Sequence, residues 1–238
     1  MSLFGWHLKQ FDFWASGMYV RRKSIDSLTE GRFQEIYDRV SAIHKAAIGG
    51  KWPDFRWRAH TAVWAGQVGL GRPGAFVELG VNSGFLSHMI CECLDFAACD
   101  REFFLFDTYE GTPIDRVARD ERAQVSSNNE TYFDIYETTR GIFAPYPNVK
   151  LVRGLLPEAL SQVVIERIAY LSIDLNYAEA EIACIEALWD RLSPGCVVLL
   201  DDYAWRNHET QKKAWDDWAA ANGTAVFTVP TGQGLLVK

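Results

Sequence analysis

Three aspartates are the side chains of this sequence whose placement most clearly suggests chemistry. Asp174 ends the apolar run AYLSID, and Asp201 and Asp202 end the run VVLLDD. If these runs form adjacent parallel strands, the three carboxylates meet at one edge of the sheet. Clustered like charges are unfavourable unless one is protonated or a cation lies between them, and all-oxygen ligands suit Mg²⁺. We therefore predict a magnesium site at these aspartates; solvated loop carboxylates and helix caps are the alternative.

A glycine-containing segment, ELGVNSG (78–84), follows the apolar run AFVEL and precedes a helix expected from about Phe85. Glycines permit a tight turn and let a ligand approach the backbone, and the start of a helix offers free N–H groups. The segment lacks the complete GxGxxG spacing of a pyrophosphate loop, which counts against a nicotinamide cofactor, and a structural turn is the alternative. The residues assigned to cofactor binding here are Glu78, Gly80, Asn82, Ser83 and Gly84.

An acidic residue, Asp107, ends the next apolar run, FFLFD. A carboxylate at this point can accept hydrogen bonds from both ribose hydroxyls of a nucleoside, whereas a cap for the following turn is the alternative. Together with the glycine-containing segment, Asp107 predicts a nucleoside-binding site. Thr108, which follows Asp107, and Gly154, which follows the run VKLVR, are assigned to the same site.

Short apolar runs alternate with helical patterns from residue 75 onward, which is typical of a mostly parallel sheet covered by helices on both faces. The turn PTGQG (230–234) between the last two runs is too short for a crossover, so that pair must be antiparallel. We predict an α/β, Rossmann-like, doubly wound, mostly parallel seven-stranded sheet with an antiparallel last strand. The expected strands are 75–79, 103–107, 149–153, 169–174, 197–202, 225–229 and 235–238, and the clearest helical patterns are 28–48, 56–70 and 178–192, the last with Gly195 soon after its end.

Two polar residues near the C-terminus are candidates for the edge that carries the aspartates. Gln233 lies in the final turn, which the topology places beside Asp201 and Asp202. His208 follows the strand of these aspartates by a few residues. A plain turn role for Gln233 and a surface position for His208 are the alternatives.

The first 54 residues differ from the rest of the chain in their residue pattern. Aromatic residues crowd the first 24 positions, and a helical pattern over 28–48 follows. Such an aromatic segment is expected to pack on the body, on a second subunit or over a substrate, because large apolar patches rarely stay exposed. We predict that residues 1–54 form a helical extension that serves as a lid or oligomer contact, followed by a cofactor-binding domain at residues 55–238. The aromatic residues are Phe4, Trp6, Phe11, Phe13, Trp14 and Tyr19.

The composition, 48% hydrophobic and 23% charged over 238 residues, excludes disordered and fibrous proteins. A net charge of −7 argues against a nucleic-acid or anionic-membrane partner, and the longest apolar runs are far too short to cross a bilayer. Five cysteines without a CxxC pair, and an N-terminus without the order of a signal peptide, are typical of a reducing cytosol. We therefore expect a cytoplasmic protein whose partner is a small molecule.

Four segments together resemble the class I S-adenosylmethionine-dependent methyltransferases, and more narrowly the macrocin, mycinamicin and novobiocin sugar O-methyltransferase family. The resemblance covers about residues 55–238, and the segments are FVELGVNSG (76–84), LFDTYEGTP (105–113), LSIDLN (171–176) and LSPGCVVLLDDYAW (192–205). The resemblance implies Mg²⁺-assisted methylation of a hydroxyl on a sugar or a similar natural-product or glycan acceptor, with S-adenosylmethionine as methyl donor. The roles it implies are a cofactor loop shaped by Glu78, Gly80 and Gly84, a ribose contact at Asp107, and Mg²⁺ ligands at Asp174, Asp201 and Asp202.

One position departs from the family pattern. Family members usually carry a second aspartate, resembling a general base, two residues after the first metal ligand, and this sequence has Asn176 there. Because an amide cannot take a proton at neutral pH, either His208 or His60 serves as the base, or the metal lowers the pKa of the hydroxyl enough for a weak base to suffice. The alternatives to an active enzyme of this kind are a catalytically inactive cofactor-binding partner protein and, more remotely, a nicotinamide-dependent oxidoreductase. The candidate catalytic residues are Asp174, Asn176, His208 and Asp201.

Overall fold

The computed structural model describes residues 13–15, 18–49 and 52–238, so Phe4, Trp6 and Phe11 of the aromatic segment lie outside the described residues. Within these ranges, the helices are all too short or too polar to cross a membrane. The five cysteines are all free thiols, and Cys91, Cys184 and Cys196 are buried.

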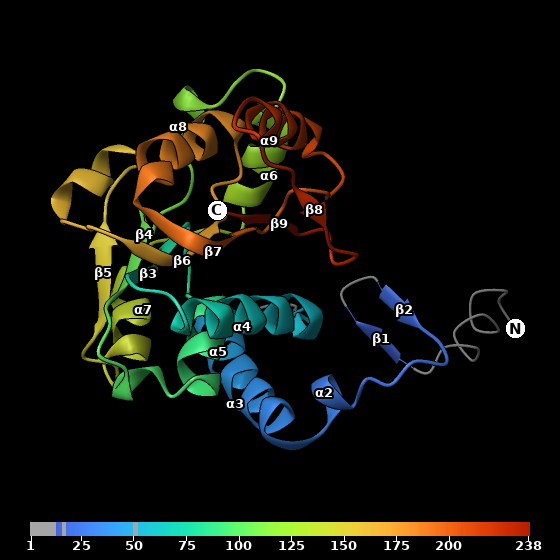
Figure 1. The fold of residues 1–238 in the computed structure, drawn as a ribbon. Helices are drawn as coiled ribbons and strands as arrows, with labels where there is room; N and C mark the ends of the chain where they lie inside the picture. Colours follow the sequence, from blue (N-terminus) through green and yellow to red (C-terminus); the bar gives the residue numbers. More distant parts are fainter. Residues whose placement is uncertain (1–12, 16–17, 50–51) are drawn as a thin grey trace, which may run out of the picture.

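Seven strands form one sheet in the order β5-β4-β3-β6-β7-β9-β8 (Figure 1). The neighbours from β5 to β7 are parallel, whereas β9 is antiparallel to both β7 and β8. The short final turn joins β8 to β9 as expected, and the predicted doubly wound α/β fold is confirmed. The strands are β3 (Ala75–Leu79), β4 (Phe103–Asp107), β5 (Val149–Arg153), β6 (Ile168–Ile173), β7 (Leu192–Leu200), β8 (Phe227–Thr228) and β9 (Gly234–Val237).

Both faces of the sheet are buried, because alternate strand residues point to opposite sides. Phe76 and Phe103 pack on one side with α4 (Arg56–Leu70) and α5 (Phe85–Cys93). Val77 and Phe104 pack on the other side with α8 (Ala178–Leu188) and α9 (Glu209–Ala221). Two further helices, α6 (Arg122–Asn129) and α7 (Tyr136–Phe143), come between β4 and β5 in the chain. The arrangement leaves the carboxyl edge of the sheet as the place where loops from several strands meet.

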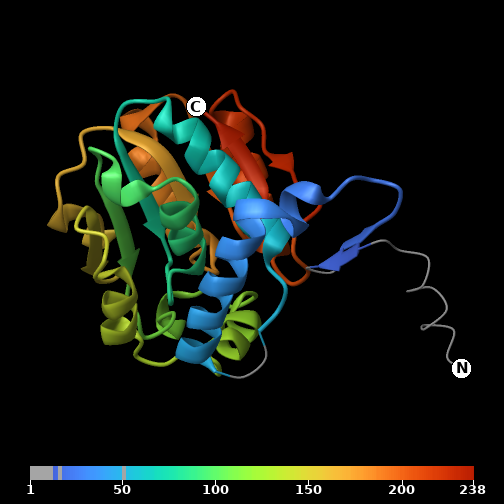
Figure 2. The same cartoon turned by 90° about the horizontal axis from the view of Figure 1, so that it is seen from below.

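The single helix expected over 28–48 is wrong at its start, where the chain forms two helices, α2 (Asp26–Thr29) and α3 (Gly31–Ile48). Glu30 between them is extended, and Gly31 has a φ of 62°, a left-handed conformation that glycine adopts at little cost. Helix α3 packs its buried residues Ile36, Tyr37 and Val40 against α4 and α5 (Figure 2). Helix α3 therefore shares a core with the helices of one sheet face.

Before α2, strands β1 (Phe13–Ala15) and β2 (Met18–Val20) form an antiparallel hairpin, which lies to the side of the body in both views (Figures 1 and 2). Tyr19 of this hairpin is 45% exposed. A role of residues 1–54 as a lid or an oligomer contact stays a prediction.

Helix α8 ends at Leu188, and the residues after it form a short 3-10 turn before β7 starts at Leu192. The helix expected over 178–192 is therefore too long, and Gly195 lies inside β7 rather than beyond a helix end. Its φ of 80° coincides with the irregular register between β6 and β7. A glycine at such a bulge lets the strand bend before the straight stretch that carries Asp201 at its end.

Candidate active site at the carboxyl edge of the sheet

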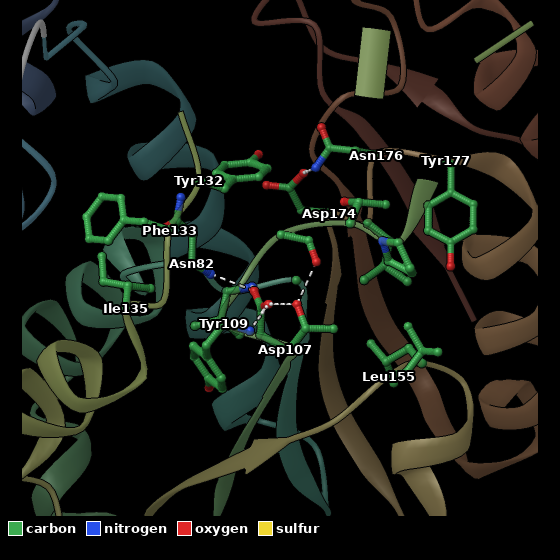
Figure 3. Close-up of a pocket in the computed structure, with 18 residues that line it drawn as sticks. Asn82, Asp107, Tyr109, Tyr132, Phe133, Ile135, Leu155, Asp174, Asn176 and Tyr177 are labelled. Atoms are coloured by element: carbon green, nitrogen blue, oxygen red, sulfur yellow. Dashed lines mark hydrogen bonds between the residues drawn. The ribbon is translucent and has the colours of Figure 1, made fainter. Parts of the chain in front are cut away.

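A pocket opens at the carboxyl ends of β3, β4 and β6 (Figure 3). It contains about 660 Å³ of space not filled by atoms, a figure that includes the open solvent at its mouth. One wall is polar and the other is aromatic and aliphatic. The residues that line it include Gly80, Asn82, Asp107, Thr108, Tyr132, Phe133, Ile135, Leu155, Asp174, Asn176 and Tyr177.

The loop after β3 approaches the rest of the site more closely than a side chain would permit. Gly80 has a φ of 83°, and a Cβ there would overlap the backbone carbonyl of Asp174. Gly84 has a φ of 80°, and a Cβ there would meet the ring of Phe143 at 2.5 Å. Both glycines are therefore required by conformation and by space, and Asn82 of the same loop lines the pocket.

Glu78 lies beneath this loop rather than in the pocket. Its carboxylate accepts a hydrogen bond from the Ser87 hydroxyl, and its side chain is buried. Burial, followed by the nearby charges of Asp174 and Asp107, raises the pKa of Glu78 well above its usual value. The structure therefore gives Glu78 a supporting position under the loop.

Asp107 ties the end of β4 to the loop after β3. Its Oδ2 accepts hydrogen bonds from the backbone N–H groups of Val81 and Asn82, the latter at 2.7 Å, and its Oδ1 accepts one from Tyr109 N–H at 2.7 Å. Each carboxylate oxygen can accept more than one hydrogen bond, so Asp107 can hold the loop and still contact a ligand. Thr108, beside it, lines the pocket and donates to the Gly111 carbonyl at 2.7 Å.

Two residues assigned to the cofactor from the sequence are turned elsewhere. The Ser83 side chain is buried against α3, where its Oγ lies 2.8 Å from His44 Nδ1. Gly154 donates its N–H to the Asp107 carbonyl at 2.9 Å and faces Gln162 and Ala159. Both contribute to the shape of the edge, and a direct cofactor contact by either stays a prediction.

Replacing Asp107 by alanine should weaken binding of S-adenosylmethionine by about 1.5–3 kcal/mol, the usual contribution of hydrogen bonds to a charged acceptor. The loss has two sources, the ligand contact and the three backbone donors released from the loop. Isothermal calorimetry with S-adenosylhomocysteine measures it. Asp107→Asn keeps one acceptor oxygen and should lose less of the binding free energy. If both variants bind S-adenosylhomocysteine with unchanged affinity, Asp107 is not part of the cofactor site.

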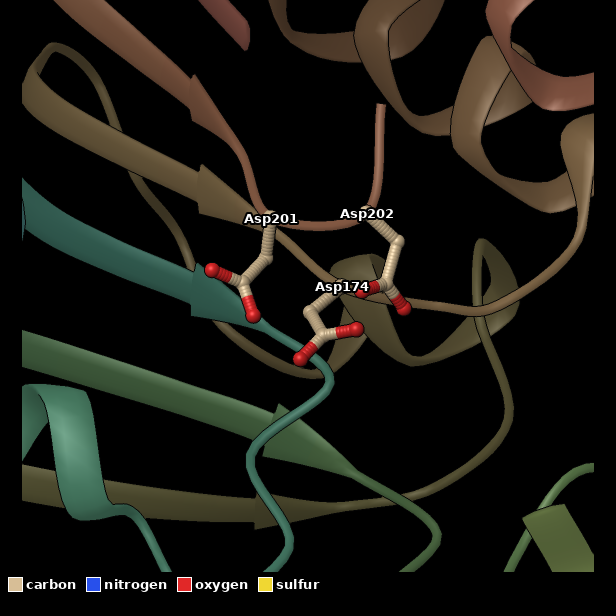
Figure 4. A group of neighbouring side chains, drawn as sticks. All are labelled: Asp174, Asp201 and Asp202. Atoms are coloured by element: carbon tan, nitrogen blue, oxygen red, sulfur yellow. The ribbon is translucent and has the colours of Figure 1, made fainter. Parts of the chain in front are cut away.

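Asp174, Asp201 and Asp202 do come together (Figure 4). One carboxylate oxygen from each lies within 4.8 Å of the others, because the parallel strands β6 and β7 end side by side. Burial, and then the charge of Asp202, raises the pKa of Asp174 well above its usual value. The three carboxylates thus form a cluster whose charge needs compensation.

Arg58, at the start of α4, supplies part of this compensation and is a residue that the sequence analysis missed. Its guanidinium forms an ion pair with Asp201, with Nε donating to Oδ1 at 3.2 Å, and its Nη2 lies 3.7 Å from Asp202. The rings of Phe55 and Trp205 lie 5.3 and 5.7 Å from the guanidinium carbon. When all three aspartates are ionised, one arginine leaves two negative charges, which is the charge that a divalent cation balances.

Gln233 faces the cluster, as its place in the final turn predicts. Its Nε2 donates to Asp201 Oδ1 at 2.7 Å, and its side chain is completely buried. Since Arg58 and Gln233 both contact Asp201, this aspartate is anchored from two elements far apart in the chain.

Asn176 lines the pocket next to Asp174 (Figure 3). Its φ of 65° is in the left-handed region, which asparagine tolerates better than most residues. Its Oδ1 accepts from Asn128 Nδ2 at 2.7 Å, and its Nδ2 donates to Asp174 Oδ1 at 3.4 Å. Tyr132 lines the same pocket, and burial followed by nearby aspartates raises its pKa. Asn176 is thus held between the Asn128 amide and the Asp174 carboxylate.

The two histidines considered as bases lie away from these residues. His208 is buried at the start of α9, where its Nδ1 contacts the Gln211 side chain. His60 packs against Phe33, with ring centroids 5.6 Å apart, and burial lowers its pKa. The pocket is lined by other residues.

Because of these positions, His208→Ala and His60→Ala should each retain methyl transfer, with a rate loss below the 100-fold that marks an essential acid–base group. Steady-state kinetics at saturating cofactor gives the comparison. A loss of 100-fold or more in one variant, with normal thermal stability, would assign the proton transfer to that histidine.

Comparison with known proteins places this geometry in a family. The family model for macrocin O-methyltransferase (TylF) matches residues 58–227. A curated relative from Streptomyces olivaceus, 8-demethyl-8-(2,3-dimethoxy-alpha-L-rhamnosyl)-tetracenomycin-C 4'-O-methyltransferase, is 27% identical over 191 residues, which are 71% of each chain.

Solved structures share the fold. The O-methyltransferase NovP matches with a TM-score of 0.72 at 19% identity, over 87% of this chain and 97% of that one. An O-methyltransferase from Bacillus cereus, in complex with S-adenosylhomocysteine, matches with a TM-score of 0.59 at 12% identity, over 90% and 95% of the two chains. The family match covers the glycine loop, Asp107 and the three aspartates, and the chain therefore belongs to the TylF macrocin O-methyltransferase family, whose members are S-adenosylmethionine-dependent O-methyltransferases.

Proposed function

We propose that this enzyme transfers the methyl group of S-adenosylmethionine to a hydroxyl of a sugar or a similar polar natural-product or glycan acceptor, with the assistance of Mg²⁺. The observation that carries the proposal is the juxtaposition of the pocket at the ends of β3, β4 and β6 with the aspartate cluster, which share Asp174. The curated relative is named for methylation within a rhamnosyl-bearing tetracenomycin, which supports a sugar-like acceptor.

The residues present fit the cofactor. Gly80 and Gly84 let the loop after β3 pack against Asp174 and Phe143, and Asp107, which lines the pocket, has acceptor capacity beyond its three backbone donors. Apolar side chains such as Leu155 and Ile135 line the same cavity and suit the flat face of an adenine ring. When bound, S-adenosylmethionine supplies an electrophilic methyl group on a sulfonium.

The residues also fit a divalent cation. Asp174, Asp201 and Asp202 offer only oxygen donors, which Mg²⁺ prefers, and Arg58 leaves two negative charges on the cluster. When bound, such a cation orients the acceptor and stabilises negative charge that develops on its oxygen. Because Arg58 and Gln233 anchor Asp201, we expect Asp174 and Asp202 to be the more adaptable ligands.

The remaining chemistry of the chain is orientation. The main requirement of a methyl transfer is that the acceptor oxygen lies in line with the methyl carbon and the sulfur. Asn176 and Tyr132 present an amide and a hydroxyl beside Asp174, where they can hydrogen-bond a polyol. Asn176 cannot remove a proton, so its proposed part is to hold the acceptor.

The decisive experiment incubates the protein with S-adenosylmethionine, Mg²⁺ and a panel of glycosides. Mass spectrometry should show a product that has gained one methylene, together with S-adenosylhomocysteine. Tight binding of S-adenosylhomocysteine without any methylated product across acceptors of related enzymes would favour the inactive partner protein instead, an alternative that Asn176 motivates.

Asn176→Asp should lower the methyl-transfer rate by about tenfold or more, since it replaces an N–H donor to Asp174 with a further negative charge. The affinity for S-adenosylhomocysteine should change little. Kinetics and calorimetry measure the two quantities. Asn128→Ala, which frees the amide oxygen of Asn176 and also the Gln124 amide without adding a charge, is the control and should have a smaller effect. A faster Asn176→Asp enzyme would mean that the site is missing a base that the aspartate restores.

A further inference from the structure

Four polar side chains form a continuous chain beneath the cofactor loop, away from the pocket. Ser83 Oγ lies 2.8 Å from His44 Nδ1, and His44 Nε2 lies 3.0 Å from His88 Nδ1. His88 Nε2 is 3.8 Å from Glu92 Oε1. Ser83 belongs to the loop after β3, His44 to α3, and His88 and Glu92 to α5. The chain therefore joins the loop to two helices.

The charge at the far end sets the direction of the hydrogen bonds. Burial acts to raise the pKa of Glu92, but hydrogen bonds from Tyr146 and Arg39 outweigh it and hold this pKa below its usual value. An ionised Glu92 favours the N–H of His88 on Nε2, which leaves His88 Nδ1 as an acceptor for His44 Nε2–H. His44 Nδ1 is then an acceptor, and the Ser83 hydroxyl donates to it.

The two histidines are suited to a permanent, neutral role. The imidazole of His44 is completely buried and that of His88 nearly so, among the rings of Trp52, Phe85 and Phe143. Burial, and then the neighbouring His88, lowers the pKa of His44 to about 3. Burial also lowers the pKa of His88, against the opposing effect of Glu92. The pair therefore stays uncharged at neutral pH.

The other end of the chain reaches a strained part of the loop. Asn82, next to Ser83, has a φ of 51° and lines the pocket. Its N–H donates to Asp107, and its carbonyl accepts from the Thr139 hydroxyl at 2.9 Å. Ser83 is 2% exposed, so its hydroxyl cannot act on a ligand in the pocket. The contact with His44 can instead stabilise the left-handed backbone conformation of this loop at Asn82.

We propose that His44 is a positioning residue for the cofactor, which acts through Ser83 to keep residues 80–84 in the conformation that binds S-adenosylmethionine. The proposal rests on the proposed function only in that this loop binds the cofactor. It makes α3, from the N-terminal part of the chain, a component of the cofactor site.

The test is a double-mutant cycle in the binding of S-adenosylhomocysteine to the full chain, measured by calorimetry. His44→Leu and Ser83→Ala should each raise the Kd about tenfold, the effect of one hydrogen bond of ordinary strength. Because both remove the same contact, the double variant should be no weaker than either single one. Ser83→Thr keeps the hydroxyl and should restore part of the affinity.

Val40→Ala is the matched control, because Val40 is completely buried on the same helix and contacts the core rather than the loop. It should lower the melting temperature and leave the Kd unchanged. A Kd raised as much as in His44→Leu would mean that loose packing of α3 explains the effect, and would overturn the proposal.

Nitrogen-15 NMR of the histidines gives an independent readout. Both should remain neutral Nε2–H tautomers from pH 6 to 8, and Ser83→Ala should shift the Nδ1 resonance of His44. If the two substitutions have additive effects on the Kd, or if His44 titrates with an ordinary pKa, the role of His44 is wrong. The proposed methyltransferase function would still stand in that case, provided that the wild-type protein binds S-adenosylhomocysteine. A wild-type protein that binds no S-adenosylhomocysteine would instead overturn the proposed function.

Discussion

Removal of divalent cations with EDTA should lower methyl transfer by about 100-fold or more, and Mg²⁺ should restore it. The reason is electrostatic: Asp174, Asp201 and Asp202 place oxygens within 4.8 Å of one another, and Arg58 offsets one of their charges. A cation bound here would contribute several kcal/mol to stabilising a developing oxyanion, and each 1.4 kcal/mol is tenfold in rate. Turnover assays in metal-depleted buffer, followed by addition of Mg²⁺, measure the effect.

Asp174→Asn should reproduce the loss in a form that Mg²⁺ does not rescue. Binding of Mn²⁺ by this variant, followed by electron paramagnetic resonance, should be weakened in parallel. Asp217→Asn, an exposed carboxylate of α9 paired with Lys213, is the control and should behave as the wild type. Full activity in metal-free buffer would leave the three aspartates as orienting groups only.

Arg58→Met should lower the free energy of unfolding by about 3–5 kcal/mol, the usual effect of removing one partner of a buried ion pair. Asp201 is 2% exposed and the Arg58 side chain 15%, so the carboxylate would stay buried with the Gln233 amide as its one remaining side-chain donor among the described residues. Chemical denaturation followed by tryptophan fluorescence measures the loss.

The same variant should respond more strongly to Mg²⁺ than the wild type does, because a ligand that binds only the folded state stabilises it and the cluster would carry an extra negative charge. Melting curves at increasing Mg²⁺ test this, with Arg58→Lys, which keeps the charge, as the control. If Mg²⁺ raises the melting temperature of Arg58→Met and of the wild type by the same amount, the charge of Arg58 does not affect cation binding.

Much of the fold could be predicted because its signals are local. The strands at 75–79 and 103–107 begin and end where their apolar runs do, since parallel strands buried on both faces read as continuous apolar stretches, and the edge strand 149–153 also has its predicted bounds. The start of α3 was harder, because one glycine with a left-handed backbone separates it from α2 within a continuous helical pattern. The role of Gly195 was equally hard to predict, since glycine is favoured both at a strand bulge and after a helix end.

Some contacts of the candidate site could likewise be predicted from the sequence, and others could not. The meeting of Asp174 with Asp201 and Asp202 follows from strand order alone, because these residues come directly after the ends of the neighbouring strands β6 and β7. Arg58 had no such signal: its contact depends on how α4 packs across the sheet, 143 residues away in the chain. Ser83 lies in a loop whose φ angles decide which side chains face the pocket, and residue type does not reveal them.

The final hairpin also has a consequence for the order in which the molecule can be assembled during synthesis. Strand β9 lies between β7 and β8 in the sheet, and the Gln233 amide just before it contacts Asp201. The part of the chain that is made earlier can pair β3 with β6 as it emerges from the ribosome, since chains fold progressively from the N-terminal side. The edge beside β7 must stay open until β9 arrives, so the contact between Gln233 and Asp201 forms late in biogenesis, and nascent chains stalled before residue 233 should hold Asp201 through Arg58 alone.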